Sequence, residues 1–204
     1  MGLTDYSLQQ LVLHLFAMVF IAAVHGVAVA GAAIAMGDPG PRYDGRLTAN
    51  PLRHLDVLGT LAGVFSAGWI RPIAVDPAEL RTGRIGLVLV VLAGTAATLA
   101  SVVVLRLVRP SLLPLLPDTT SALVFAVIET IAEVSLWFAI VNVLPLPPFT
   151  GAHLLVAAVP QWRDRLARSQ TWAAAPLAIL AVAGVFTRLL DTVYKVVAKA
   201  VLGE

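Results

Sequence analysis

Residues 9–36 form one apolar stretch that contains no Asp, Glu, Lys or Arg. A helix of about 20 predominantly apolar residues is long enough to cross the roughly 30 Å hydrocarbon core of a bilayer. The stretch can therefore span a membrane with a tilt or a bend. Composition agrees, because 59% of the residues are hydrophobic and 13% are charged, whereas about a quarter are charged in a soluble domain. The sequence predicts an integral membrane protein with a single domain over residues 1–204.

Three later segments are also apolar enough to be membrane spans, and they lie at 85–105, 121–144 and 173–190. Residues 57–70 are apolar as well, but 14 residues are too few to cross a bilayer as a helix. We expect this segment to be re-entrant or to lie at the membrane interface. The predicted fold is therefore an all-α membrane protein with about four transmembrane helices.

The end of the chain has a different pattern. Over residues 187–202, apolar residues recur at helical spacing opposite Arg188, Asp191, Lys195 and Lys199. This pattern predicts an amphipathic tail that lies on the membrane or on a partner. The segments 37–56, 71–84 and 160–172 are polar and are expected to form loops.

The basic residues indicate an orientation. One side of the predicted membrane protein carries nine arginines, at positions 42, 46, 53, 71, 81, 84, 163, 165 and 168. The other side carries five basic residues, at positions 106, 109, 188, 195 and 199. The positive-inside rule places the arginine-rich loops in the cytoplasm and the N-terminus outside. The small net charge of +2 does not indicate a nucleic-acid partner.

His25 lies within the first apolar stretch and is followed by Gly26 and Val29. A helix with the pattern H-E-x-x-H presents two imidazoles on one face, where they bind Zn²⁺, and its Glu activates a metal-bound water. Here the Glu position is Gly26 and the second His position is Val29. Neither side chain can bind a metal or accept a proton.

The surroundings of His25 nevertheless resemble the site-2 protease family of intramembrane zinc metalloproteases. The similarity covers roughly residues 15–160. Four further segments contribute to it: Gly37-Asp38-Pro39 with G-R-L-T-A-N-P-L-R-H-L-D at 45–56, G-W-I-R-P-I at 68–73, A-G-T-A-A-T at 93–98, and N-V-L-P-L-P-P-F-T-G-A-H at 142–153. The resemblance implies a polytopic fold in a bacterial cytoplasmic membrane, with its site facing the cytoplasm.

The resemblance also implies the positions of the metal site. The third metal ligand of the family, an Asp, falls on Thr150, and an Asn of the family falls on Thr98. Only His25 remains of the family's ligands, whereas a catalytic zinc site needs about three. We therefore expect no cofactor and no catalytic residue. The expected protein is a pseudoprotease that acts as a binding, scaffold or accessory subunit of a larger membrane complex.

Two alternatives remain open at this stage. Glu129 and Glu133 lie one helical turn apart in the third span, and with His25 and His153 they could form a noncanonical zinc site of an intramembrane protease. Pairing of these carboxylates with Arg, Thr or backbone groups would be a purely structural role. In the second alternative, His14 and His25 lie about three turns apart on one helix face, as in haem- or quinone-associated membrane anchors.

Overall fold

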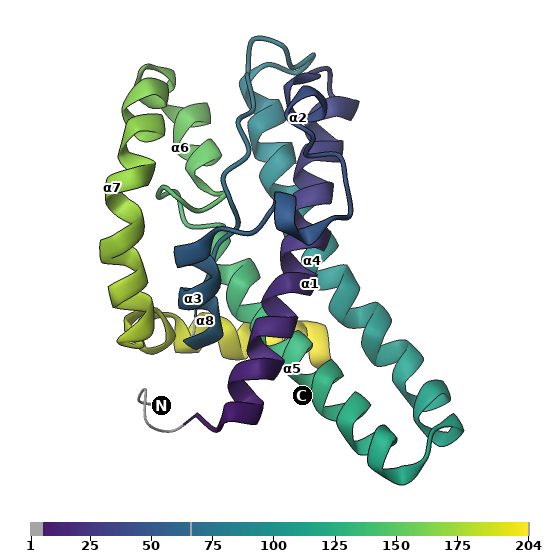
Figure 1. Cartoon of the computed structure of the whole chain (residues 1–204). Helices are drawn as coiled ribbons and strands as arrows, with labels where there is room; N and C mark the ends of the chain where they lie inside the picture. Colours follow the sequence, from purple (N-terminus) through teal and green to yellow (C-terminus); the bar gives the residue numbers. More distant parts are fainter. Residues whose placement is uncertain (1–5, 66, 204) are drawn as a thin grey trace.

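The computed structural model describes residues 6–65 and 67–203. These residues form helices joined by turns, and they contain no β-strand, only an isolated antiparallel bridge between Leu55 and Ile70. Three helices are long and apolar enough to cross a membrane: α1 (Leu8–Ala35), α4 (Arg84–Leu112, continued by the short η3 at Leu113–Leu115) and α5 (Asp118–Asn142). They pack against one another (Figure 1). The predicted all-α membrane fold is confirmed.

Helix α1 begins with a capping box and continues as a face of small residues. The Ser7 side chain accepts a hydrogen bond from the Gln10 backbone N–H, and the Gln10 side chain accepts one from the Ser7 N–H. This pair satisfies two backbone donors that the first turn leaves free. Further along, α1 packs closely against α4 and α5, and its small buried residues include Ala22 and Ala30.

The segment 57–70, which was predicted to be re-entrant or interfacial, has two parts. Helix α3 (Val57–Phe65) is preceded by α2 (Gly40–Tyr43) and η2 (Pro51–Arg53), and the chain after it, from residue 67 to 76, is not helical. Several long-range bonds hold this segment. Among them, the Asn142 side chain donates to the Gly68 carbonyl, and the Arg71 N–H donates to the His54 carbonyl. Because distant residues bind this backbone, the apolar composition of 57–70 did not indicate where the helix ends.

The C-terminal third differs most from expectation. The predicted loop 160–172 is helical, because η4 (Pro160–Trp162) follows α6 (Ala152–Ala158) and leads into α7 (Arg163–Val182). The predicted span 173–190 is not one helix. It breaks before α8 (Val185–Leu202), where Gly184 adopts a left-handed conformation with φ of 71°. The two helices meet at 72°, and α8 runs across the bundle (Figure 1). The predicted amphipathic tail corresponds to α8.

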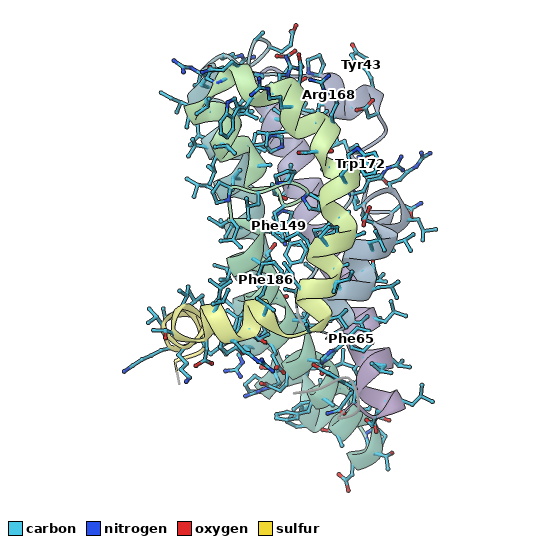
Figure 2. The ribbon with its side chains drawn as sticks, turned by 90° about the vertical axis from the view of Figure 1, so that its left-hand side faces the viewer. Tyr43, Phe65, Phe149, Arg168, Trp172 and Phe186 are labelled. Carbon is cyan, nitrogen blue, oxygen red and sulfur yellow. The ribbon has the colours of Figure 1, made fainter. Side chains whose placement is uncertain are left out.

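Aromatic rings join the second half of the chain to the 67–76 segment. Phe149 packs edge-to-face against Trp69 and against Phe186 of α8, with both centroid distances at 5.8 Å. Phe149 and Phe186 lie inside the molecule in Figure 2, whereas Trp172 of α7 points outward and is 82% exposed. This packing fixes the loop that precedes α6, and Thr150 lies on that loop.

Candidate functional site

The structure brings three segments of the family resemblance together around His25. His25 is fully buried on α1. Its Nδ1 lies 3.0 Å from Thr98 Oγ1 on α4, and its Nε2 lies 2.9 Å from Thr150 Oγ1 on the loop before α6. The Phe138 ring of α5 packs edge-to-face against the imidazole at 5.0 Å. Both ring nitrogens therefore bind hydroxyl groups, and the rest of the ring is packed.

The direction of each hydrogen bond follows from one further contact. Thr98 Oγ1 also lies 2.9 Å from the Gly94 carbonyl oxygen, which can only accept. A hydroxyl has one proton to donate, so Thr98 donates it to Gly94 and accepts the Nδ1–H of His25. In the neutral imidazole that full burial favours, His25 Nε2 then carries no proton and accepts the hydroxyl proton of Thr150. We call this series, from Thr150 through His25 and Thr98 to Gly94, the threonine–histidine chain. It is electrically neutral.

Gly26 lies against a second buried imidazole. A Cβ atom at position 26 would be 2.1 Å from His54 Nδ1, which is too close for any side chain. His54 Nε2 donates to the Thr48 carbonyl at 2.9 Å, and its Nδ1 has no hydrogen-bond partner within the described part of the chain. Burial lowers the pKa of His54, and the nearby Arg46 charge adds to that shift, against the raising effect of the Thr48 bond. The space next to the Glu position of the family is thus filled by His54.

The side chains around His25 do not fit a catalytic zinc ion. At the positions where the resemblance places ligands, Val29 offers only carbon and Thr150 offers a neutral hydroxyl already bound to His25. Zinc in proteins is bound by Cys, His, Asp or Glu. Across residues 6–65 and 67–203, no group of three or more such side chains is placed to hold a metal.

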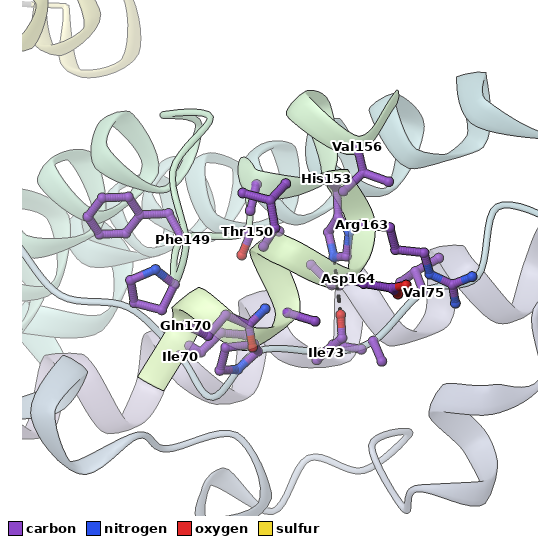
Figure 3. Close-up of a pocket in the computed structure, with 17 residues that line it drawn as sticks. Ile70, Ile73, Val75, Phe149, Thr150, His153, Val156, Arg163, Asp164 and Gln170 are labelled. Atoms are coloured by element: carbon purple, nitrogen blue, oxygen red, sulfur yellow. Dashed lines mark hydrogen bonds between the residues drawn. The ribbon is translucent and has the colours of Figure 1, made fainter. Parts of the chain in front are cut away.

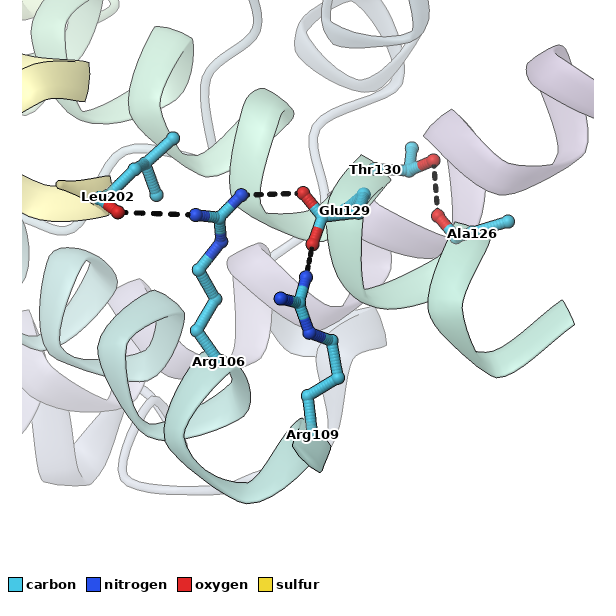
Figure 4. Close-up of polar contacts among 6 residues, drawn as sticks. All are labelled: Arg106, Arg109, Ala126, Glu129, Thr130 and Leu202. Carbon is cyan, nitrogen blue, oxygen red and sulfur yellow. Dashed lines mark hydrogen bonds and ion pairs between the residues drawn. The ribbon is translucent and has the colours of Figure 1, made fainter. Parts of the chain in front are cut away.

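The residues of the alternative zinc site lie apart from one another. Glu129 binds the guanidinium groups of Arg106 and Arg109, with 2.6 Å to Arg106 Nη2 (Figure 4). Glu133 is exposed on the same helix, and His153 Nε2 donates to the Ile73 carbonyl at 3.1 Å. Glu129 therefore has the structural role that the sequence left open, which is to pair with arginine side chains. Arg106 and Arg109 belong to α4, which continues past the predicted end at residue 105.

His14, the other residue of the haem alternative, contacts protein. Its Nδ1 lies 2.6 Å from the Val64 carbonyl at the end of α3, and its ring packs edge-to-face on Tyr6. A backbone carbonyl only accepts, so Nδ1 carries the proton. This contact fastens the start of α1 to the end of α3, so His14 has a packing role.

A pocket of about 360 Å³ opens beside Thr150. The 70–75 segment, α6 and the first half of α7 enclose it, and most of its lining is apolar (Figure 3). His153 is polar, and burial lowers its pKa despite the opposing effect of its bond to Ile73. At the edge, Arg163 binds Asp76 at 2.9 Å. The pKa of Asp76 is lowered by the N–H of Ala78 and then by Arg163.

Sequence reasoning identified His25, Thr98 and Thr150 as motif positions but did not predict that they bind one another. The sequence did contain an indication, because Thr98 and Thr150 stand at the positions of an Asn and an Asp in two of the resembled motifs. The sequence did not indicate the pocket, since its lining combines residue 29 and segment 70–75 with the distant region 148–170.

Comparison with known proteins supports the resemblance. The chain is 33% identical over 145 residues to a protein of Bacillus subtilis (strain 168) named "Putative zinc metalloprotease YwhC". The aligned region covers 67% of this chain and 64% of that relative, so the chain spans less than two thirds of the relative's length. No family model matches the chain, and no solved structure matches it.

Proposed function

We propose that this protein is a site-2-protease-like membrane protein that has lost its hydrolytic centre and serves as a binding subunit of a larger membrane complex. The threonine–histidine chain carries this proposal. It engages both nitrogens of the one ligand that remains from the resembled zinc site. A metal at Nε2 would first have to displace the Thr150 hydroxyl, and then only one protein ligand would hold it.

The chemistry of hydrolysis supports the same conclusion. A catalytic zinc needs about three protein ligands and an open position for water. Proton transfer by a general base contributes about 10²–10⁴-fold more, and the position of that base is Gly26. His54 fills the adjoining space, so no carboxylate can occupy it without movement of that ring. The residues present hold the helices together and offer no activated water.

Binding is the function that the remaining geometry supports. The pocket beside Thr150 has the size of a small ligand site, and such sites combine an apolar lining with a few polar groups. Here the polar groups come from Thr150, His153, Arg163, Asp164 and Gln170. An apolar peptide segment of a membrane partner fits this chemistry better than a charged ligand does.

Metal analysis tests the loss of hydrolysis. The full chain is purified, incubated with zinc, dialysed, and assayed for zinc content and for cleavage of membrane-spanning peptides. We expect far less than stoichiometric zinc, no cleavage, and the same values for a His25→Ala variant. Stoichiometric zinc that disappears in His25→Ala, together with cleavage, would reject the proposal.

Crosslinking tests the binding role. The chain contains no cysteine, so a single cysteine reports only on its own position. A photo-reactive group at Gln170 faces the pocket, and one at Trp172 lies on the outer surface of the same helix as a matched control. We expect a discrete adduct with a membrane protein from position 170 and none from position 172. Equal labelling from both positions would contradict a pocket-bound partner.

A further inference from the structure

Helix α8 is fastened to the bundle along its length, and at its start Phe186 packs edge-to-face against Phe149. In its middle, the Tyr194 ring stacks on Trp137 of α5, with ring centroids 4.3 Å apart and planes 10° apart. At its end, the Leu202 carbonyl accepts a hydrogen bond from Arg106 of α4 at 3.4 Å (Figure 4). These contacts hold α8 across the bundle, at 72° to α7, instead of parallel to the spans.

The outer surface of α8 divides into two stripes. Leu189, Val193 and Val196 form an apolar stripe and are 73%, 45% and 65% exposed. The second stripe is basic and consists of Arg188, Lys195 and Lys199, all exposed. With about 3.6 residues per turn, the centres of the two stripes lie roughly 110° apart around the helix axis. A helix in a membrane surface needs this division, because one side meets acyl chains while another meets headgroups.

The charge of α8 is unbalanced. Among residues 185–202 there are three basic side chains and one acidic side chain, Asp191, which binds Lys195 at 2.6 Å. The neighbouring charges of α4 and α5 balance one another, because Arg106 and Arg109 face Glu129 and Glu133 lies one turn further. The surplus positive charge at this end of the bundle is therefore that of α8.

We infer that α8 is an interfacial helix that binds anionic phospholipid headgroups. The apolar stripe enters the boundary between headgroups and acyl chains, and the basic stripe contacts the phosphate oxygens. The Trp137–Tyr194 stack agrees with this depth, since Trp and Tyr are enriched at membrane interfaces. The inference does not depend on the proposed function, because it concerns neither His25 nor the pocket.

The absence of cysteine from the sequence allows a direct test of depth. The full chain carries one environment-sensitive fluorophore, at Val193→Cys or at Lys195→Cys, in vesicles of phosphatidylcholine that contain brominated lipid. We expect the probe at 193 to be quenched by the brominated chains and the probe at 195 to remain unquenched. Equal quenching at both positions would overturn the interfacial placement.

The charge requirement is tested with the probe at 193. Adding phosphatidylglycerol to the vesicles should increase its quenching, and the double change Arg188→Gln with Lys199→Gln should remove that increase. Asp191→Asn is the matched control, because it removes a negative charge instead of positive ones. It should make the quenching increase more when phosphatidylglycerol is added. With α8 unchanged, we expect the protein to retain phosphatidylglycerol about tenfold more than phosphatidylcholine during purification. The double variant should lose this preference.

Two results would reject anionic lipid as the partner. One is a response to phosphatidylglycerol that is the same in the double variant and in Asp191→Asn. The other is protection of the probe at 193 in detergent that grows with protein concentration, because that would show a second copy covering the stripe. Unchanged far-UV circular dichroism would establish that the variants keep the fold; Asp191 is half-buried, and the other changed positions are exposed.

Discussion

Two polar clusters lie among the long helices, and they differ in charge and in burial. Around His25, every group is neutral, His25 and Thr98 are fully buried, and Thr150 is half-buried at the edge of the pocket. Each hydrogen-bonding atom of the ring has a partner. Around Glu129, three formal charges meet, and the side chains of Arg106 and Glu129 remain 20% and 30% exposed. The neutral cluster lies deep between α1, α4 and the Thr150 loop. The charged cluster lies beside the end of α8.

The difference follows from the cost of burial. A neutral polar group can be buried at little net cost when all of its hydrogen bonds are made. A buried ion pair loses its hydration, and its mutual attraction often does not exceed that loss. The centre around His25 is therefore stable as a neutral hydrogen-bond chain. The charges are kept where water or headgroups can reach them.

The largest expected effect comes from filling the space beside His25. Gly26→Ala places a Cβ against His54 and should lower the free energy of unfolding by about 3 kcal/mol. In a His54→Ala background the same change should be stabilising, because Ala favours a helix over Gly by about 1 kcal/mol. Chemical unfolding in detergent, followed by circular dichroism, measures both. A cost that is equal in the two backgrounds would show that His54 does not fill this space.

The next effect tests the neutral chain. Thr150→Val keeps the shape but leaves His25 Nε2 buried without a donor, which should cost about 2 kcal/mol of unfolding free energy. Thr150→Ser keeps the hydroxyl and should cost less than about 1 kcal/mol. The two variants are compared by unfolding at low and high salt, and neither value should depend on salt. If Val and Ser have the same effect, the hydroxyl is not part of the chain.

The sequence predicted the long elements well. The charge-free stretch 9–36 became α1 at Leu8–Ala35, and the tail 187–202 became α8 at Val185–Leu202. Both depend on local signals, namely the absence of charge in one segment and helical spacing in the other. The break at Gly184 was missed, because apolar composition alone does not distinguish one span from two bent helices. The helix over 163–172 was missed because a polar helix looks like a loop by composition.

The site was predicted in part. His25, Gly26, Val29 and Thr150 were named as motif positions, but the bonds of His25 join residues that are 73 and 125 positions apart. Only the packing of the folded chain brings these residues together. Glu129 shows the same limit, namely that the sequence does not show which distant residues contact a side chain. Its place in an apolar segment suggested a functional carboxylate, but the arginines that neutralise it lie on another helix.

A smaller effect is expected at the charged cluster. Glu129→Gln removes the carboxylate that pairs with two arginines and should cost about 1 kcal/mol or less, since the groups are partly exposed. Salt should reduce this difference, because mobile ions screen exposed charges over about 8–10 Å. Thermal unfolding over a salt series measures it. A cost above that of Thr150→Val, independent of salt, would mean that the two clusters are buried alike.

The smallest effect concerns His153, the neutral imidazole of the pocket. Burial lowers its pKa in the folded protein, so the unfolded chain takes up a proton first as the pH falls. Stability should therefore decrease below about pH 7, by roughly 0.4 kcal/mol between pH 7.5 and 6.5. His153→Gln keeps a donor for the Ile73 carbonyl and should remove this part of the slope, while His54, whose pKa is also lowered, supplies a remainder. Chemical unfolding at a series of pH values measures the difference. A slope that is unchanged in His153→Gln would show that this ring titrates as it does in water. In that case the pocket would not keep its histidine neutral, unlike the interior around His25.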